Sequence, residues 1–177
     1  MAWNPPVNWS TNEEVTSTKM SQQVYSNMLW LNEQRPRAAM AGSLSVASGS
    51  TFATPSYVAS TSEWNDVTIN VGGVYTGVNH FYGTAPTVGA YMVTCHVIFA
   101  ADADGKRGVC LSSSAAGAGT IYAQETIENI GATEIPAVSV ASLVQVAANG
   151  KVYIGIRQNS GASMTCAVRF TMWWVAT

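Results

Sequence analysis

Apolar residues recur at every second position in the longest patterned stretches of the sequence, and this alternation limits the possible folds more than any other feature. From Tyr91 to Phe99 every odd-numbered residue is apolar, and from Met164 to Trp174 every even-numbered residue is apolar. A β-strand sends alternate side chains to opposite faces, so a period of two predicts strands rather than helices. Residues 138–146 and 152–156 carry shorter versions of the same pattern.

The opposite faces of the two longest stretches are also rich in apolar residues. An antiparallel sheet needs only one apolar face, because its second face can remain in water. Two strands that are apolar on both faces therefore predict a sheet covered once by a partner sheet and once by a neighbouring subunit. The residues expected in that subunit interface are Met92, His96, Ile98, Trp173 and Val175.

The charge content agrees with a surface that is partly covered. Charged residues make up 10% of the chain, against about 25% in a typical soluble domain. The net charge of −2 argues against nucleic acid or an anionic membrane as a partner. The N-terminal sequence MAWNPPVNWS lacks the apolar run of a signal peptide, so we expect synthesis in a reducing cytoplasm.

Glycine-containing turns separate the apolar stretches. Asp104-Gly105 and Asn149-Gly150 are typical of β-hairpins. Asp102 and Asp104 also resemble part of a calcium loop, but Ser112 stands where that loop needs a glutamate, so a hairpin is favoured. Many short strands joined by such turns, without a second helix, predict an all-β sandwich.

The first 37 residues follow a different pattern and are expected to form a docking arm and helix, with a β domain over residues 38–177. Residues 1–14 contain two prolines and no period, which indicates an extended arm. Thr16 or Ser17 offers an N-cap, an apolar stripe at helical spacing follows to about Glu33, and Arg35-Pro36 ends the helix. The arm and the stripe either pack on the chain's own domain or bind a partner, and the apolar residues concerned are Trp3, Val7, Trp9, Met20, Val24, Met28 and Leu31.

Residues that could support catalysis or bind a cofactor are few, and neither an enzyme nor a cofactor is expected. His80 and His96 are the two imidazoles, and Cys95 and His96 alternate on one strand, so their side chains point to opposite faces. Three cysteines without a CxxC motif fit neither a disulfide framework nor a zinc site, and free thiols are expected.

Two further groups of residues have a functional and a structural interpretation. Glu125, Glu128 and Glu134 could pair as glycosidase carboxylates, but solvated charge at a sheet edge is favoured. Several aromatic residues could stack on sugars, but packing beneath the loops is favoured. These aromatic residues are Tyr57, Trp64, Tyr75, Phe81 and Tyr82.

The N-terminal segment resembles the corresponding segment of many tailed-phage structural proteins. The resemblance rests on opening tryptophans, an EVVTA-like motif, a short helix and a terminal Arg-Pro. The residues that carry it are Trp3, Trp9, Glu14-Val15-Thr16, Lys19-Met20-Ser21-Gln22, Asn27, Leu29, Leu31 and Arg35-Pro36. Ser17-Thr18 departs from the pattern, in which alanine is usual.

Residues 40–177 resemble the tumour necrosis factor and complement-type jelly roll. The resemblance implies a jelly-roll β-sandwich that assembles as a compact homotrimer around the sheet holding the first, middle and last strands. Asn149-Gly150-Lys151 departs from the Gly-Asp that is usual in the family. The segments that carry the resemblance are residues 87–91, 138–146, 151–156, 158–161 and 170–175.

The resemblance of the N-terminal segment to tailed-phage structural proteins implies a bacteriophage virion protein, found in the particle, and the scarcity of catalytic residues predicts that it is non-enzymatic. The first hypothesis is a trimeric capsid decoration or cement protein that contacts the major capsid protein through its N-terminal arm. The alternative is a trimeric tail appendage that contacts tail proteins and binds a host receptor or glycan. A virion-associated hydrolase is the third and weakest hypothesis, because the sequence offers it so few catalytic residues.

Overall fold

The computed structural model describes residues 16–21, 24, 35–49, 66–74, 82–101, 105–114, 119–128 and 135–176. The chain divides into two compact units, Met1–Arg35 and Pro36–Thr177. The boundary lies close to the one expected between residues 37 and 38. The roles expected for the two parts, docking and trimerisation, stay predictions.

The first unit contains the start of the expected helix. Helix α1 (Ser17–Met20) begins after Thr16, whose backbone is extended and whose hydroxyl accepts a hydrogen bond of 3.3 Å from the N–H of Lys19. Of the two predicted candidates, Thr16 and Ser17, the N-cap is therefore Thr16, since a cap accepts from an N–H that has no partner within the helix. The rest of the predicted helix, apart from residues 21 and 24, lies outside the described residues.

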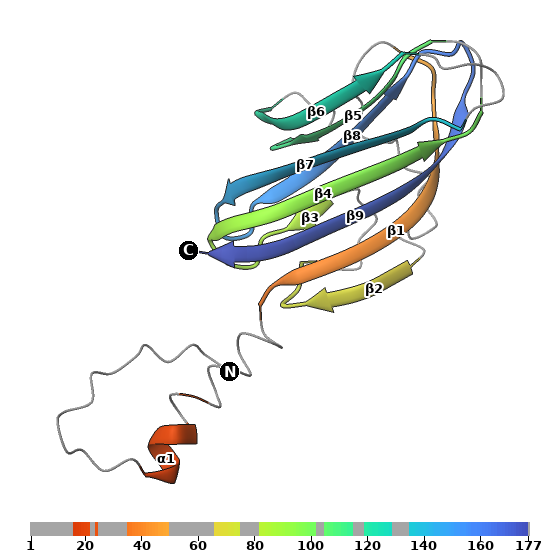
Figure 1. The fold of residues 1–177 in the computed structure, drawn as a ribbon. Coiled ribbons are helices and arrows are strands. Elements are labelled where there is room, and N and C mark those ends of the chain that lie inside the picture. The colour runs from red at the N-terminus through yellow and green to blue at the C-terminus, as the bar shows by residue number, and fades with distance from the viewer. Residues whose placement is uncertain are drawn as a thin grey trace. The chain divides into compact units, whose positions relative to one another are not determined.

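The second unit is a sandwich of two antiparallel sheets, shown in Figure 1. One sheet has the strand order β2-β1-β9-β4-β7 and the other has the order β3-β8-β5-β6. This confirms the predicted all-β jelly-roll class. The strands of the described chain are β1 (Arg37–Val46), β2 (Asp66–Val71), β3 (Tyr82–Thr84), β4 (Gly89–Phe99), β5 (Arg107–Ser112), β6 (Ile121–Ile127), β7 (Ala137–Val146), β8 (Lys151–Gln158) and β9 (Met164–Ala176).

The last strand lies in the middle of the five-stranded sheet. β9 pairs with β1 along the whole length of β1, from Arg37 opposite Trp173 to Val46 opposite Met164. On its other side it pairs with β4, where Val97 lies opposite Val168. The first and last strands of the sandwich are therefore neighbours, and the sheet is complete only when the end of the chain is in place (Figure 1).

The period-two pattern matches the burial of the strands. In β4 every odd-numbered residue from Tyr91 to Phe99 is buried, and in β9 every even-numbered residue from Met164 to Met172 is buried. These side chains meet Leu111 and the apolar residues of β8 in one core between the sheets. Burial of such apolar area is the main favourable contribution to folding.

The sequence predicts β-hairpins at Asp104-Gly105 and Asn149-Gly150, and both predictions are wrong, because the strands on either side of each turn belong to different sheets. Asp104-Gly105 precedes β5 and Asn149-Gly150 precedes β8, and in both cases the chain passes from the five-stranded sheet to the four-stranded sheet. The local conformation is nevertheless typical of a tight turn, with φ of 61° at Asn149 and 78° at Gly105. Residues that tolerate positive φ serve any sharp reversal, whereas the sheet that the next strand joins depends on distant pairings. Residues 102–104 lie outside the described residues.

A buried glutamine fixes the chain where β8 ends. Gln158 is fully buried, and its Nε2 donates to the carbonyl oxygens of Val46 at 2.9 Å and Ala162 at 2.6 Å. Its Oε1 accepts from the backbone N–H of Ser160 at 2.8 Å and from the Ser160 hydroxyl at 2.7 Å. One side chain thus joins the end of β1 to the loop that leads into β9.

Replacing Gln158 with alanine should lower the free energy of unfolding by about 2–4 kcal/mol, because buried polar partners lose their hydrogen bonds. Urea denaturation at a fixed protein concentration measures the change. Gln124→Ala, at an exposed position of β6, is the matched control and should stay within about 0.5 kcal/mol of the parent. Equal stabilities of the two variants would contradict this role of Gln158.

Candidate functional site

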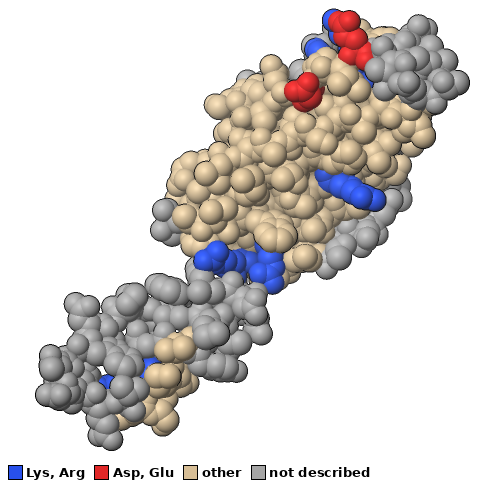
Figure 2. Space-filling model, viewed as in Figure 1, with Lys and Arg blue, Asp and Glu red and all other residues tan. Residues whose placement is uncertain are grey.

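The outer face of the five-stranded sheet presents a row of large side chains across four strands. Arg37 lies opposite Trp173, Trp173 opposite Met92, and Met92 opposite Leu143. In Figure 1 this sheet lies in front of β3, and Figure 2 shows few charged side chains on the face turned to the reader. The strands β1, β4, β7 and β9 contribute two charged residues to this outer face, Arg37 and Arg169.

Several apolar side chains on this face are exposed. The exposed fractions are 43% for Met92, 59% for Leu143, 48% for Trp173 and 44% for Val175. Isolated exposed apolar residues are ordinary, but a contiguous group of them marks a surface that contacts another molecule. Here the four exposed residues lie on one face of the five-stranded sheet.

The polar groups beside this apolar row bind one another. The hydroxyls of Thr94 and Thr171 lie 2.7 Å apart, and Nδ1 of His96 lies 2.7 Å from the hydroxyl of Ser139. A polar group that already has a partner costs less to bury than one that must leave water without a partner. These pairs therefore make the face easier to cover.

The structure places all five predicted interface residues on this face. Met92, Trp173 and Val175 are exposed, whereas His96 and Ile98 are partly buried by their neighbours in the sheet. Leu143 was not anticipated, because the other outward residues of β7 are serine, alanine and glutamine. Leu143 extends the apolar row only because it lies opposite Met92. That position depends on the register between β4 and β7, which the sequence does not give.

Two of the predicted docking residues are described in the N-terminal unit. Met20 is 44% exposed and Val24 is 40% exposed. Apolar side chains that are this accessible remain available for contact with a partner. The other predicted docking residues lie outside the described residues, and they are Trp3, Val7, Trp9, Met28 and Leu31.

The described residues bring together few groups that could support catalysis. Cys95 is buried in the core and His96 lies on the opposite face of β4, as the alternation predicts, so they do not form a dyad. In the described part of the chain no group of three or more His, Cys, Asp or Glu side chains could hold a metal ion. Glu128 forms an ion pair of 2.5 Å with Lys106, which lowers the pKa of its carboxyl. His80 and Glu134 lie outside the described residues.

One of the aromatic residues considered for sugar stacking is described. The ring of Tyr82 packs edge-on against Tyr153 with 5.1 Å between centroids. The ammonium group of Lys151 lies 4.3 Å from the centre of the same ring. This cation–π contact covers one face of Tyr82, which favours packing over sugar stacking at this position. Tyr57, Trp64, Tyr75 and Phe81 lie outside the described residues.

The three cysteines are free and buried. Burial raises the pKa of the Cys95 thiol strongly, with a smaller contribution from Cys110. Burial also raises the pKa of Cys166 from 9.0 to about 12, against an opposing effect of the positive charge on Arg107. At Cys110 burial raises the pKa, although the Gly155 backbone and Arg157 act in the opposite direction.

No protein-family model and no curated protein matches the sequence. The fold, however, matches solved structures. The globular domain of zebrafish complement 1qA protein has a TM-score of 0.51 and 15% identity, over 80% of this chain and 98% of that one. The tumour necrosis factor Eiger from S. frugiperda has a TM-score of 0.53 and 9% identity, over 81% of this chain and 94% of that one. These similarities establish the jelly-roll fold. Among the described residues no helix is long and apolar enough to cross a membrane.

The native thiols should resist alkylation at pH 8, because the thiolate is the nucleophile and all three sites are buried. Mass spectrometry after brief exposure to iodoacetamide should find the native chain unlabelled and the chain in guanidinium labelled at all three cysteines.

A thiol whose pKa rises on folding stabilises the fold fully below its unfolded pKa, so the free energy of unfolding should fall as the pH rises above about 9. Rapid labelling of the native protein would contradict the burial of these thiols.

Proposed function

We propose that this protein is a non-enzymatic structural component of a tailed-phage particle, where it forms a homotrimer and decorates the capsid. The observation that carries the proposal is the exposed apolar outer face of the five-stranded sheet. The resemblance of the N-terminal segment to tailed-phage structural proteins supports the particle, and the jelly-roll resemblance supports the trimer.

The outer face has the properties of a subunit interface. Trp173, Met92 and Leu143 form a continuous apolar row, and tryptophan and methionine are enriched at interfaces. Arg37 and Arg169 have long side chains. Their guanidinium groups can lie at the edge of the proposed interface while their aliphatic stems pack inside the interface. In a homotrimer three copies of this face meet around a threefold axis, so each copy removes part of its neighbours' apolar area from water.

The N-terminal unit is proposed as the attachment device. It forms a unit separate from the sandwich, and the described part of its apolar stripe, Met20 and Val24, is exposed. A helix of about four turns is marginal when isolated, so the predicted helix would gain order by packing on the particle. The jelly roll already has a continuous core of its own.

The alternative function is a trimeric tail appendage that binds a host receptor or glycan. It uses the same trimer and the same N-terminal attachment, and differs in location and copy number. Quantitative mass spectrometry of purified particles distinguishes the two, since hundreds of copies indicate a capsid protein and a few copies indicate a tail protein. Absence of the chain from washed particles would contradict both.

Leu143→Glu should convert the trimer into monomers, because it places a charge at the β7 end of the apolar row, where burying that charge in an interface is costly. Light scattering coupled to size-exclusion chromatography measures the mass, and circular dichroism reports the fold. Gln124→Glu, at an exposed position on the four-stranded sheet, introduces the same charge and should leave the mass unchanged. An unchanged mass for Leu143→Glu would place the interface elsewhere.

A chain that begins at Pro36 should remain folded and trimeric but should no longer bind particles that lack the protein. Pro36 is retained because its carbonyl oxygen accepts a hydrogen bond of 2.8 Å from the N–H of Trp174.

In the full chain, Trp3→Ala with Trp9→Ala should weaken binding to particles, whereas Asn4→Ala with Asn8→Ala should not. Co-sedimentation with particles measures occupancy, and full occupancy by the truncated chain would assign attachment to the jelly roll.

A further inference from the structure

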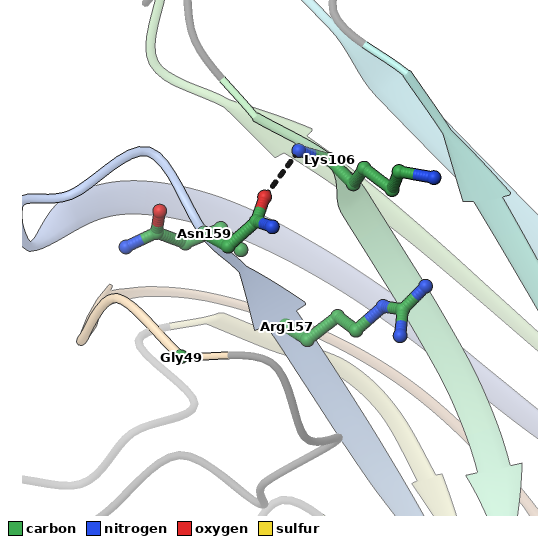
Figure 3. A pocket seen from close by; sticks show the side chains of 5 residues that line it. Gly49, Lys106, Arg157 and Asn159 are labelled. Carbon is green, nitrogen blue, oxygen red and sulfur yellow. Dashed lines mark hydrogen bonds between the residues drawn. The ribbon is translucent and has the colours of Figure 1, made fainter.

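A polar hollow lies at the end of the four-stranded sheet where β5 begins and β8 ends. Its volume is about 270 Å³, and it is lined by Gly49, Lys106, Arg157, Gln158 and Asn159 (Figure 3). The described lining residues supply two cations and two amides. The hollow therefore favours an anionic ligand with several hydrogen-bonding groups.

Two cationic side chains, those of Lys106 and Arg157, line the hollow, and a third, that of Arg107, is buried nearby. In Figure 3 the side chains of Lys106 and Arg157 extend on the same side of the hollow. Arg157 is held in place by a hydrogen bond of 3.1 Å from its Nη2 to the hydroxyl of Thr126. The buried Arg107 donates from Nη1 to the carbonyl oxygen of Lys106 at 3.2 Å, and salt screens a buried charge less than an exposed one.

Hydrogen bonds join the backbone segments around the hollow. Asn159 accepts a hydrogen bond at Oδ1 from the backbone N–H of Lys106 (Figure 3) and donates its own N–H to the carbonyl oxygen of Lys106 at 3.3 Å. The N–H of Gly49 donates to the carbonyl oxygen of Gln158 at 2.7 Å. Since Oδ1 of Asn159 is the acceptor, its Nδ2 group serves as a donor to a ligand. A rigid site loses little conformational entropy on binding.

The chain's own carboxylate shows how Lys106 binds an acid. Oε1 of Glu128 lies 2.5 Å from Nζ of Lys106, and the Glu128 side chain is 77% exposed. An ion pair this exposed contributes little to stability. A ligand carboxylate that contacts both Lys106 and Arg157 can therefore displace Glu128 from Lys106.

We infer that this hollow binds a sugar acid, with the carboxylate held by Lys106 and Arg157 and a ring hydroxyl held by Asn159. Arginine and lysine donors form the strongest hydrogen bonds to carboxylates. The cationic and amide side chains among the described lining residues suit a ligand that carries several hydroxyl groups. The volume is below the ~300–1,000 Å³ of typical drug-sized sites, so it accommodates one sugar unit rather than an extended chain.

The inference goes beyond the proposed assembly role and does not depend on it. The lining side chains Arg157 and Lys106 belong to the end of the four-stranded sheet, whereas the proposed interface is the outer face of the other sheet. A trimer would therefore leave the hollow accessible, and a monomer would still contain it.

Isothermal titration calorimetry of the full chain with glucuronate at low ionic strength tests the inference. Saturable millimolar binding is expected, with glucose and acetate at least about fivefold weaker because each lacks one part of the recognition. Lys106→Gln and Arg157→Gln should each weaken glucuronate binding about fivefold or more. Lys151→Gln, which removes a cation from the other end of the same sheet, should have no effect.

Glu128→Gln provides a second test, because a purely structural role of the Lys106–Glu128 ion pair would not predict tighter ligand binding in this variant. Removing the competing carboxylate should tighten glucuronate binding by about two- to fivefold. Three results would overturn the inference: no saturable binding of glucuronate, galacturonate or N-acetylneuraminate; equal binding of acetate and glucuronate; or glucuronate binding unaffected by Lys106→Gln and Arg157→Gln. In the first of these cases, binding of an acidic peptide would indicate a protein ligand instead.

Discussion

The pairing of β9 with both β1 and β4 is the constraint on which the rest of the structure depends. One strand closes the five-stranded sheet, supplies Cys166, Phe170 and Met172 to the core, and places Trp173 on the outer face. Each contact joins segments far apart in the sequence, so the chain must be nearly complete before this sheet forms. The same strand pairings therefore form both the core, on the inner face of the sheet, and the proposed interface, on its outer face.

This double use of β4 and β9 explains the unusual composition. A strand that is apolar on one side needs polar residues on the other to remain soluble, but Met92 and Trp173 occupy the outer side where polar residues would be expected. The polar groups nearby, such as His96 and Ser139, are paired with each other. A chain with 10% charged residues therefore has one largely apolar outer face, which is the proposed interface.

The strands and their buried faces could be predicted from the sequence because alternation is a local property. Tyr91–Phe99 and Met164–Trp174 needed no knowledge of their partners. The N-cap could be narrowed to Thr16 or Ser17 from the position before the helical stripe, and the structure identifies it as Thr16. The resemblance to the jelly-roll family then supplied the arrangement of the strands, and the match to solved structures confirms that fold.

The features that were missed all depend on distant residues. Asn149-Gly150 has the chemistry of a hairpin, but β7 pairs with β4 and β8 pairs with β5, so the turn joins two sheets. The hollow combines residues from the end of β1, the start of β5 and the end of β8. Nothing in the local sequence around Lys106 or Asn159 indicates that they lie together, because the backbone pairing of β5 with β8 creates their proximity.

Sedimentation equilibrium of the full chain is the most direct test of the central claim that copies of this protein cover the outer face of the five-stranded sheet. We expect a single species with three times the chain mass of 18.7 kDa at micromolar concentration, unchanged on further dilution over the range of the method. A species with the mass of one chain at that concentration would contradict the account, because Trp173, Met92 and Leu143 would then remain exposed to water.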